Sequence, residues 1–153
     1  MEIVELLKPE GVISSLRVRS KKQALQELAK QASEVSGLDE REIFETLLER
    51  ERLGTTGVGN GVAIPHGKMS ELNALHGLFA RLAKPVQFDA IDEQPVDLIF
   101  LLLAPESAGA DHLKALARVS RLLRDKTVCE KLRGTDSSDG LYLLLTESTA
   151  QAA

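Results

Sequence analysis

Cysteine and aromatic residues are scarce in this chain of 153 residues, which has one cysteine, no tryptophan and 3% aromatic residues in total. A single cysteine excludes an intrachain disulfide. Cys129 lies in a segment whose apolar residues recur at helical spacing, where a cysteine is usually a small buried side chain. Nothing in that segment would activate a thiolate, so we expect no redox function.

Blocks of like charge and long apolar runs are missing as well. The 19 Lys and Arg residues are spread among 23 Asp and Glu residues, whereas nucleic-acid binding draws its affinity from clustered cations. No apolar stretch approaches the roughly 20 residues of a membrane span. The first residues, MEIVELLKPEG, carry acids and lack a basic leader, so no secretory signal is visible. We therefore expect a cytoplasmic protein with no nucleic-acid partner and no membrane insertion.

The remaining composition is that of a globular protein, with 43% hydrophobic and 27% charged residues. A chain of this length can bury a continuous core without disulfides or metals. It contains no Gly/Ser linker, repeat or low-complexity tract. The sequence predicts a single domain over residues 1–153.

The N-terminal part predicts a strand followed by a helix. Residues 12–18 (VISSLRV) are the strand candidate. Ser20 has the position of a helix N-cap, with Gln23 completing a capping box, and Gly37 ends the helix. The basic run 19–22 (RSKK) is expected to be the solvated start of this helix.

Further strands and helices alternate along the rest of the chain. Residues 96–105 (VDLIFLLLAP) are almost wholly apolar and close with proline, which predicts a strand covered on both faces at the centre of a sheet. Residues 77–88 (GLFARLAKPVQF) predict a strand that ends at Pro85. Helices are expected from Asp39 to Gly54 and over residues 110–124, 126–133 and 135–147, the last of which could also be a strand. The buried face of 110–124 is predicted to hold Leu113, Leu116, Ala117, Ser120 and Leu123. This alternation indicates an α/β sandwich.

Residues 54–68 (GTTGVGNGVAIPHGK), the glycine-rich segment, contain five of the eleven glycines. A P-loop needs four residues between its glycines and then Lys followed by Ser or Thr. Here five residues separate Gly61 from Gly67, and Met69 stands where the hydroxyl should be. The dinucleotide fingerprint fails because Val62 occupies its third glycine position. Neither nucleotide-binding motif is present.

The three histidines do not form a metal motif. His66, His76 and His112 have neither i, i+4 spacing nor neighbouring cysteines. We expect no metal and no cofactor, and we interpret His76 as a turn residue.

His66 stands out within the glycine-rich segment. It follows a short apolar strand, Val62–Ile64, with Pro65 restricting the backbone before it and Gly67 permitting close approaches after it. This framing would present an imidazole at a surface, where its neutral nitrogen can attack a phosphoryl group. The simpler alternative is a histidine in a tight turn.

Two other residues fit a phosphoryl site. Arg50 precedes the segment, and its guanidinium suits phosphate oxygens. His112 falls in the expected first turn of the helix after the central strand, where backbone N–H groups favour an anion. Each has an alternative, because Arg50 could be a solvated cation in the LERER run and His112 a surface cap residue.

Residues 50–68, RERLGTTGVGNGVAIPHGK, closely resemble the active-site segment of enzyme IIA proteins of the bacterial phosphotransferase system (PTS), in the fructose and mannitol superfamily. The resemblance extends over nearly the whole chain, including SKKQALQELA, DLIFLLLAP and DHLKALARVSRLL. Asn60, where mannitol-type relatives usually carry an acid, agrees with the nitrogen-related branch, enzyme IIA-Ntr. The resemblance implies one IIA type-2 domain, with a mixed five-stranded sheet flanked by helices.

The resemblance also implies a function. His66 would be phosphorylated through Nε2, with His112 and Arg50 holding the phosphoryl oxygens and with no need for ATP or magnesium. The donor would be a phosphorylated HPr-like carrier, NPr, which a PTS enzyme I charges from phosphoenolpyruvate. The phosphorylation state would then control targets such as sensor kinases or potassium transport components.

Two alternatives remain open from the sequence. The protein could be a fructose- or mannitol-type IIA that passes phosphate to a separate IIB for sugar uptake, or a binding module whose His66 is never phosphorylated. The candidates for an apolar partner surface around His66 are Leu53, Val58, Val62 and Met69, with core packing favoured for Leu53 and Val62.

Overall fold

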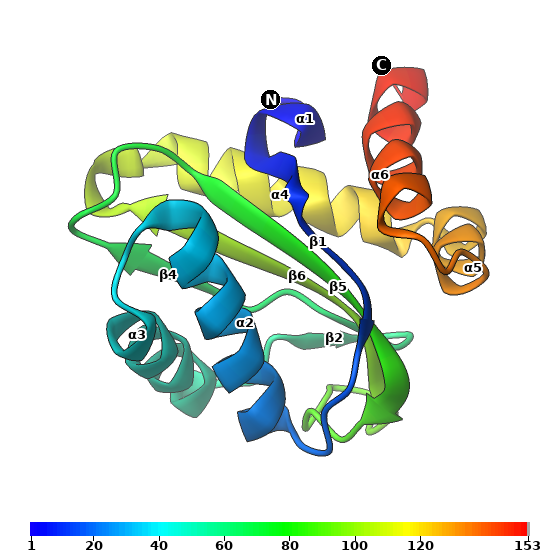
Figure 1. Cartoon of the computed structure of the whole chain (residues 1–153), viewed down its shortest axis with the longest axis horizontal. Coiled ribbons are helices and arrows are strands. Elements are labelled where there is room, and N and C mark those ends of the chain that lie inside the picture. The colour runs from blue at the N-terminus through cyan, green and yellow to red at the C-terminus, as the bar shows by residue number, and fades with distance from the viewer. Residues whose placement is uncertain (153) are drawn as a thin grey trace.

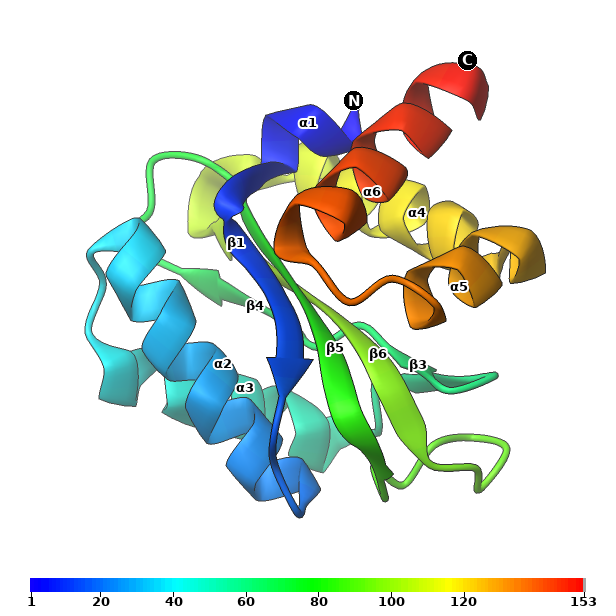
Figure 2. The same ribbon diagram turned by 45° about the vertical axis from the view of Figure 1, so that its right-hand side comes forward.

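The computed structural model describes residues 1–152, with side chains up to residue 147. In chain order the elements are α1 (Ile3–Leu6), β1 (Leu7–Leu16), α2 (Lys21–Ser36), α3 (Glu40–Leu53), β2 (Gly57–Gly59), β3 (Val62–Ala63), β4 (His66–Met69), β5 (His76–Val86), β6 (Val96–Pro105), a 3-10 turn (Glu106–Ala108), α4 (Ala110–Arg124), α5 (Lys126–Arg133) and α6 (Ser138–Ala152). Figures 1 and 2 show α2 and α3 on one face of the sheet and α4, α5 and α6 on the other.

The sheet is mixed, with the order β1-β5-β6-β3-β2. β1 runs parallel to β5, β5 antiparallel to β6, and β2 antiparallel to β3. Both β3 and β4 run parallel to β6, one after the other along its length. The sheet has six strands, one more than the resemblance implies, because β3 and β4 lie along β6 as two separate strands; the hydrogen-bonded path across the sheet is five strands wide.

β6 is the central strand, as its apolar run predicts. From Leu98 to Leu103 its residues alternate between two separate cores, and each of these six is at most 1% exposed. Ile99 and Leu101 pack into the core under α2 and α3, whereas Leu98 and Phe100 pack into the core under α4, α5 and α6. A strand buried on both faces has no polar alternation, which is why its sequence is nearly all apolar.

Capping residues fix the ends of α2 and α3 as predicted. The Ser20 side chain accepts a hydrogen bond from the Gln23 backbone N–H, and Gly37 ends α2 in the left-handed region at φ 81°. Asp39 accepts from the backbone N–H of Glu42 at the start of α3. The capping box differs in one contact, because the Gln23 side chain accepts from the backbone N–H of Arg19 instead of Ser20.

Three local predictions are wrong. The first strand begins earlier than residue 12, at Leu7, because it pairs with β5 from Gly77 onward. His76 is the first residue of β5 and pairs with Leu103, so it is not a turn residue. Within the RSKK run, Lys21 is not simply solvated, since its side chain is 18% exposed and forms an ion pair.

The buried face of α4 is also rotated from the predicted one. The residues turned inward are His112, Ala115, Val119, Leu122 and Leu123. Leu113 is 68% exposed, and Ala117 is exposed as well. Apolar residues cover more than one side of this helix, so spacing alone does not set its rotation. Packing of α4 against α1, α5 and α6 as well as β6 selects the inward side.

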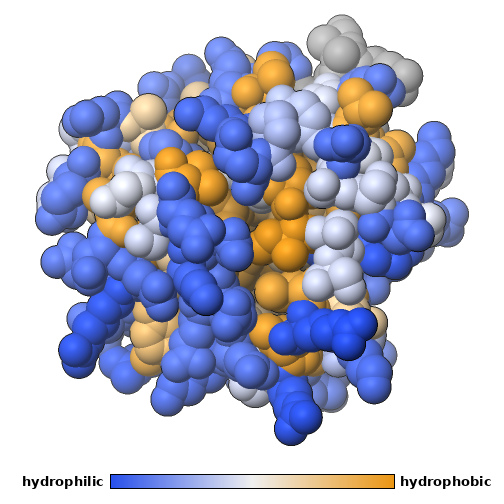
Figure 3. All heavy atoms as spheres, viewed as in Figure 1, coloured by the Kyte–Doolittle hydropathy of each residue, from blue (hydrophilic) through white to orange (hydrophobic). Residues whose placement is uncertain are grey.

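The face seen in Figure 1 is mostly hydrophilic, with an apolar band between α2 and α6 (Figure 3). β1 lies between the two helical layers there (Figures 1 and 2) and forms one end of the strand order. The divided strand that carries His66 lies on the other side of β6.

Gly67 allows α3 to pack closely on β4. A Cβ atom at Gly67 would lie 2.7 Å from Cγ2 of Thr46. We expect Gly67→Ala to lower the free energy of unfolding by about 1–3 kcal/mol, because added atoms in a packed contact force the elements apart. Combining it with Thr46→Ser, which removes the clashing methyl group, should restore most of this loss in urea titrations. Gly134→Ala is the control, since its Cβ would meet only ordinary contacts of 3.5 Å or more.

Candidate functional site

The glycine-rich segment folds into a β-hairpin that leads to His66. β2 and β3 are joined by Asn60 and Gly61, with φ values of 57° and 79°. A two-residue Asn-Gly turn with both φ angles positive matches the twist of a hairpin. This hairpin was not among the predicted elements, although an Asn-Gly pair between short apolar runs is its usual signal. Gly61 serves the turn, and Gly57 allows β2 to pack closely against Ala90.

The hairpin turn is held from the other helical layer. Arg133 of α5 donates from Nη2 to the backbone carbonyl of Asn60 at 2.8 Å and forms a two-point ion pair with Asp97 of β6. A side chain at Gly61 would meet this guanidinium, since a Cβ there would lie 2.5 Å from Arg133 Nη2. The hairpin that leads to His66 is therefore anchored to α5 and β6.

His66 is the first residue of β4, after Ile64 and Pro65 interrupt the outer strand. Its Nδ1 lies 2.9 Å from the backbone carbonyl of Ile64. A carbonyl can only accept, so this contact assigns the proton to Nδ1 and leaves the lone pair on Nε2. The imidazole is therefore held by a hydrogen bond from Nδ1 to a backbone carbonyl, and its Nε2 carries a lone pair that can accept.

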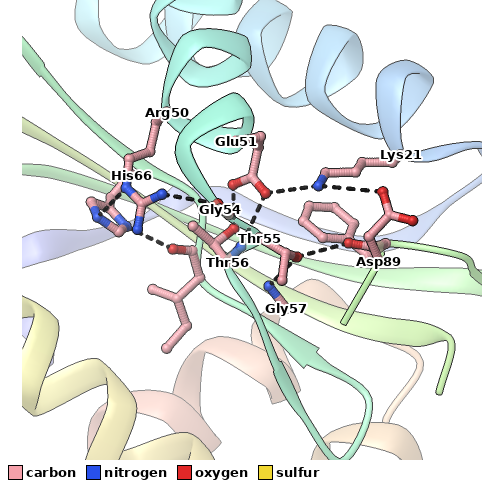
Figure 4. Close-up of polar contacts among 11 residues, drawn as sticks. Lys21, Arg50, Glu51, Gly54, Thr55, Thr56, Gly57, His66 and Asp89 are labelled. Carbon is pink, nitrogen blue, oxygen red and sulfur yellow. Dashed lines mark hydrogen bonds and ion pairs between the residues drawn. The ribbon is translucent and has the colours of Figure 1, made fainter. Parts of the chain in front are cut away.

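Arg50, in the last turn of α3, lies next to that lone pair (Figure 4). Its Nε donates to His66 Nε2 at 3.2 Å, and its Nη1 donates to the carbonyl of Gly54 at 2.9 Å. The second bond fixes the guanidinium against the end of its own helix. Arg50 and His66, 16 residues apart in sequence, are thereby brought into direct contact.

His112 lies in the first turn of α4, as predicted, and its ring stands edge-to-face with that of His66 at 5.7 Å between centroids. It is 5% exposed, so it is no surface cap residue. Its buried Nδ1 has no hydrogen-bond partner among the described residues. The structure thus brings all three predicted site residues together, beside backbone N–H groups of a helix N-terminus.

Burial and neighbouring charge keep both imidazoles of the site neutral. Burial lowers the pKa of His66, and the Arg50 charge adds to this, while the Ile64 carbonyl and Glu51 oppose it. Burial lowers the pKa of His112, with further contributions from His66 and Lys68. Because both pKa values lie below the ordinary 6.5, both imidazoles are uncharged at neutral pH.

These shifts predict a loss of stability in mild acid. Between the lowered pKa of His112 and 6.5, the unfolded chain binds a proton that the folded chain does not. The free energy of unfolding should therefore fall as pH drops below about 6.5. In urea titrations at several pH values, His112→Gln should give a shallower fall than the unaltered protein. Equal slopes for the two proteins would contradict this prediction.

The apolar candidates around His66 divide into exposed and buried ones. Leu53 and Val58 are 85% and 44% exposed, so the core packing favoured for Leu53 is wrong. Val62 and Met69 are 1% and 4% exposed and belong to the core, which removes Met69 from the predicted partner surface. Leu113, predicted to be buried, is instead exposed directly after His112. Leu53 and Leu113 are thus close in sequence to Arg50 and His112, and Val58 lies in the glycine-rich segment that leads to His66.

The rest of the described chain offers no competing metal site. Residues 1–152 hold no group of three or more His, Cys, Asp or Glu side chains placed to bind a metal ion. In the same range, no helix combines the length and the apolar character needed to span a membrane. Cys129 is buried in α5, and its thiol donates to the carbonyl of Leu123 at 3.2 Å, as expected for a packed side chain.

Comparisons with known proteins show the family of this chain. The profile of the family described as "Phosphoenolpyruvate-dependent sugar phosphotransferase system, EIIA 2" matches residues 5–148. The chain belongs to this family. Among IIA proteins it is 58% identical to the nitrogen regulatory protein of Bradyrhizobium diazoefficiens, over 153 residues and the full length of both chains.

Two further relatives belong to the same branch of the IIA family. The nitrogen regulatory protein of Escherichia coli is 42% identical over 97% of this chain and 91% of its own length. The crystal structure of nitrogen regulatory protein IIA-Ntr from Neisseria meningitidis superposes with a TM-score of 0.89 at 38% identity, covering 94% of this chain and 99% of that one. This IIA chain is thus a member of the nitrogen regulatory proteins.

Proposed function

We propose that residues 1–153 act in the cytoplasm as one IIA type-2 domain that accepts a phosphoryl group on Nε2 of His66. The donor is a phosphorylated HPr-like carrier, NPr, charged in turn by enzyme I from phosphoenolpyruvate. The observation that supports this most directly is the pair of bonds on His66, with Nδ1 on a carbonyl and Nε2 facing the Arg50 guanidinium. This is the protonation state that a nitrogen nucleophile needs.

The reaction exchanges one phosphorus–nitrogen bond for another. The Nε2 lone pair forms a bond to phosphorus while the bond to the carrier histidine breaks, and that electron pair returns to the carrier imidazole. The Nδ1 proton stays on His66, where the Ile64 carbonyl stabilises the positive charge that develops on the ring. Positioning and charge stabilisation dominate such transfers, so neither ATP nor magnesium takes part.

Arg50 and His112 receive the transferred charge in this proposal. The Arg50 Nε–H that contacts Nε2 in the free protein turns to a phosphoryl oxygen once Nε2 is occupied. His112 lies in the first turn of α4, with its ring centroid 5.7 Å from that of His66, so its imidazole and the first-turn N–H groups of α4 are the other donors in this proposal. Donors fixed in advance are worth more than mobile ones because they need no reorganisation during transfer.

Partner binding would use three exposed apolar residues that lie in the segments carrying Arg50, His66 and His112. Leu53, Val58 and Leu113 are each more than 40% exposed, and an apolar centre with a polar rim is the common form of a transient interface. Phosphorylation adds about two negative charges at its centre. Targets such as sensor kinases or potassium transport components would therefore bind differently to the two states.

The experiment is direct labelling. The purified protein is incubated with phosphoenolpyruvate, enzyme I and the HPr-like carrier, and its intact mass is recorded before and after acid treatment. We expect a gain of one phosphoryl group that acid removes. If an active carrier gives no gain in mass, the proposal is overturned, and the alternative of a binding module whose His66 is never phosphorylated is supported. Mixing the labelled protein with fructose- and mannitol-type IIB domains separates regulation from sugar uptake, since rapid loss of phosphate to IIB would favour uptake.

A further inference from the structure

A buried carboxylate lies next to Arg50 and does not enter the reaction just described. The Glu51 side chain is 3% exposed. Its Oε1 accepts from the backbone N–H of Thr56 at 3.0 Å and pairs with Lys21 Nζ at 2.9 Å, and its Oε2 accepts from the Thr56 hydroxyl (Figure 4). Three elements therefore meet on one carboxylate: the start of α2, the end of α3 and the residue before β2.

Stability alone explains this arrangement poorly. Removing a carboxylate and an ammonium group from water costs several kcal/mol, and well-packed apolar residues of similar size often serve a fold equally well or better. α3 is already closed at its end, where the Gly54 N–H bonds to the Glu51 carbonyl. The network of Glu51, Lys21 and Thr56 next to Arg50 therefore suggests a role other than stabilising the fold.

The network leads through the backbone to the His66 ring. Thr56, held by Glu51 at both its N–H and its hydroxyl, accepts at its carbonyl from the N–H of Ile64 at 3.0 Å. The carbonyl of the same Ile64 is the group 2.9 Å from His66 Nδ1. Glu51 therefore fixes the position of Thr56, and the Thr56 carbonyl fixes the position of Ile64. The Ile64 carbonyl in turn keeps the proton of the imidazole on Nδ1.

We propose that Glu51 is a positioning residue for His66, holding through Thr56 and Ile64 the carbonyl that selects the Nδ1–H form and leaves Nε2 free. This rests on the proposed function of His66. Glu51 touches no reacting atom. Lys21 supports this role of Glu51, because its ammonium group neutralises a carboxylate that would otherwise repel the incoming phosphoryl group.

The test compares two adjacent threonines. Thr56→Val removes the hydroxyl bond to Glu51, whereas Thr55→Val removes a hydroxyl that bonds to the carbonyl of Phe88 and lies outside the path to His66. Glu51→Gln is the third variant and keeps the size of the side chain without its charge. The readouts are the nitrogen-15 shifts of the His66 ring and the rate of phosphorylation by phosphoramidate, a small donor that needs no carrier.

In the unaltered protein and in Thr55→Val, the ring should show a protonated Nδ1 and an unprotonated Nε2. In Glu51→Gln and Thr56→Val, the form protonated on Nε2 should become populated. The rate should fall about 10–100-fold, the usual cost of losing a residue that orients a reactive ligand. A merely structural role would change stability but leave the balance of ring forms in the folded protein unaltered.

An unchanged ring spectrum and a rate within about twofold of the unaltered protein, in either folded variant, would overturn the proposal. If Glu51→Gln does not fold, the ring spectrum and the rate of Thr56→Val still test the proposal, because this variant keeps the Glu51–Lys21 ion pair. Failure of the proposed function is distinguishable, since it would appear as no phosphorylation of the unaltered protein while the ring spectrum still tests Glu51.

Discussion

Replacing His66 with alanine is expected to abolish phosphorylation completely while leaving the fold intact. His66 supplies the only nitrogen that the described contacts both orient and leave with a lone pair beside a cation. The ring is half-buried at the start of a short strand, so its loss should cost no more than about 1–2 kcal/mol of stability. Intact-mass measurement after incubation with phosphoenolpyruvate, enzyme I and the HPr-like carrier should show no added phosphoryl group.

His76→Gln is the matched control for this experiment. It changes a histidine of the same chain that lies at the start of β5, where it pairs with Leu103 of β6. Burial and Lys8 also lower the pKa of His76, so it too is neutral at pH 7. It should be labelled to the same extent as the unaltered protein. Full labelling of His66→Ala would place the phosphorylation site elsewhere.

The parts of this fold that depend on neighbours in sequence were predictable. Ser20 and Asp39 start their helices because their side chains accept from backbone N–H groups three residues later. The central position of β6 follows from its apolar run. His66 could be proposed as a site residue because the residues framing it, Pro65 and Gly67, are adjacent to it in the chain.

Other features depend on contacts between distant segments, which spacing does not reveal. The rotation of α4, and hence the burial of His112 and the exposure of Leu113, is set by several elements at once. Met69 is an apolar residue near the site in sequence, yet the alternation of β4 turns it into the core. The role proposed for Glu51 was hidden because its partners are Lys21, far upstream, and Thr56, which is linked to Ile64 only through its backbone carbonyl.

Arg50→Gln should have the second largest effect, slowing phosphoryl acceptance about 100-fold without abolishing it. This is the usual cost of removing one fixed donor from a site where charge develops. Arg50→Lys should recover only part of the rate, because an ammonium group lacks the planar fork that contacts His66 and Gly54 together. Arg52→Gln is the control, since Arg52 lies two residues along α3 and pairs with Glu49 on its exposed side.

The same variant should change the titration of His66. Arg50 contributes to lowering the pKa of His66, so Arg50→Gln should raise that pKa toward its ordinary value of 6.5. The rate deficit should therefore widen as pH falls below about 6.5, because more of the variant's imidazole is protonated and cannot attack. Rates measured with phosphoramidate across pH, beside a nitrogen-15 titration of the ring, separate this protonation effect from lost stabilisation. A rate equal to that of Arg52→Gln at every pH would remove Arg50 from the site.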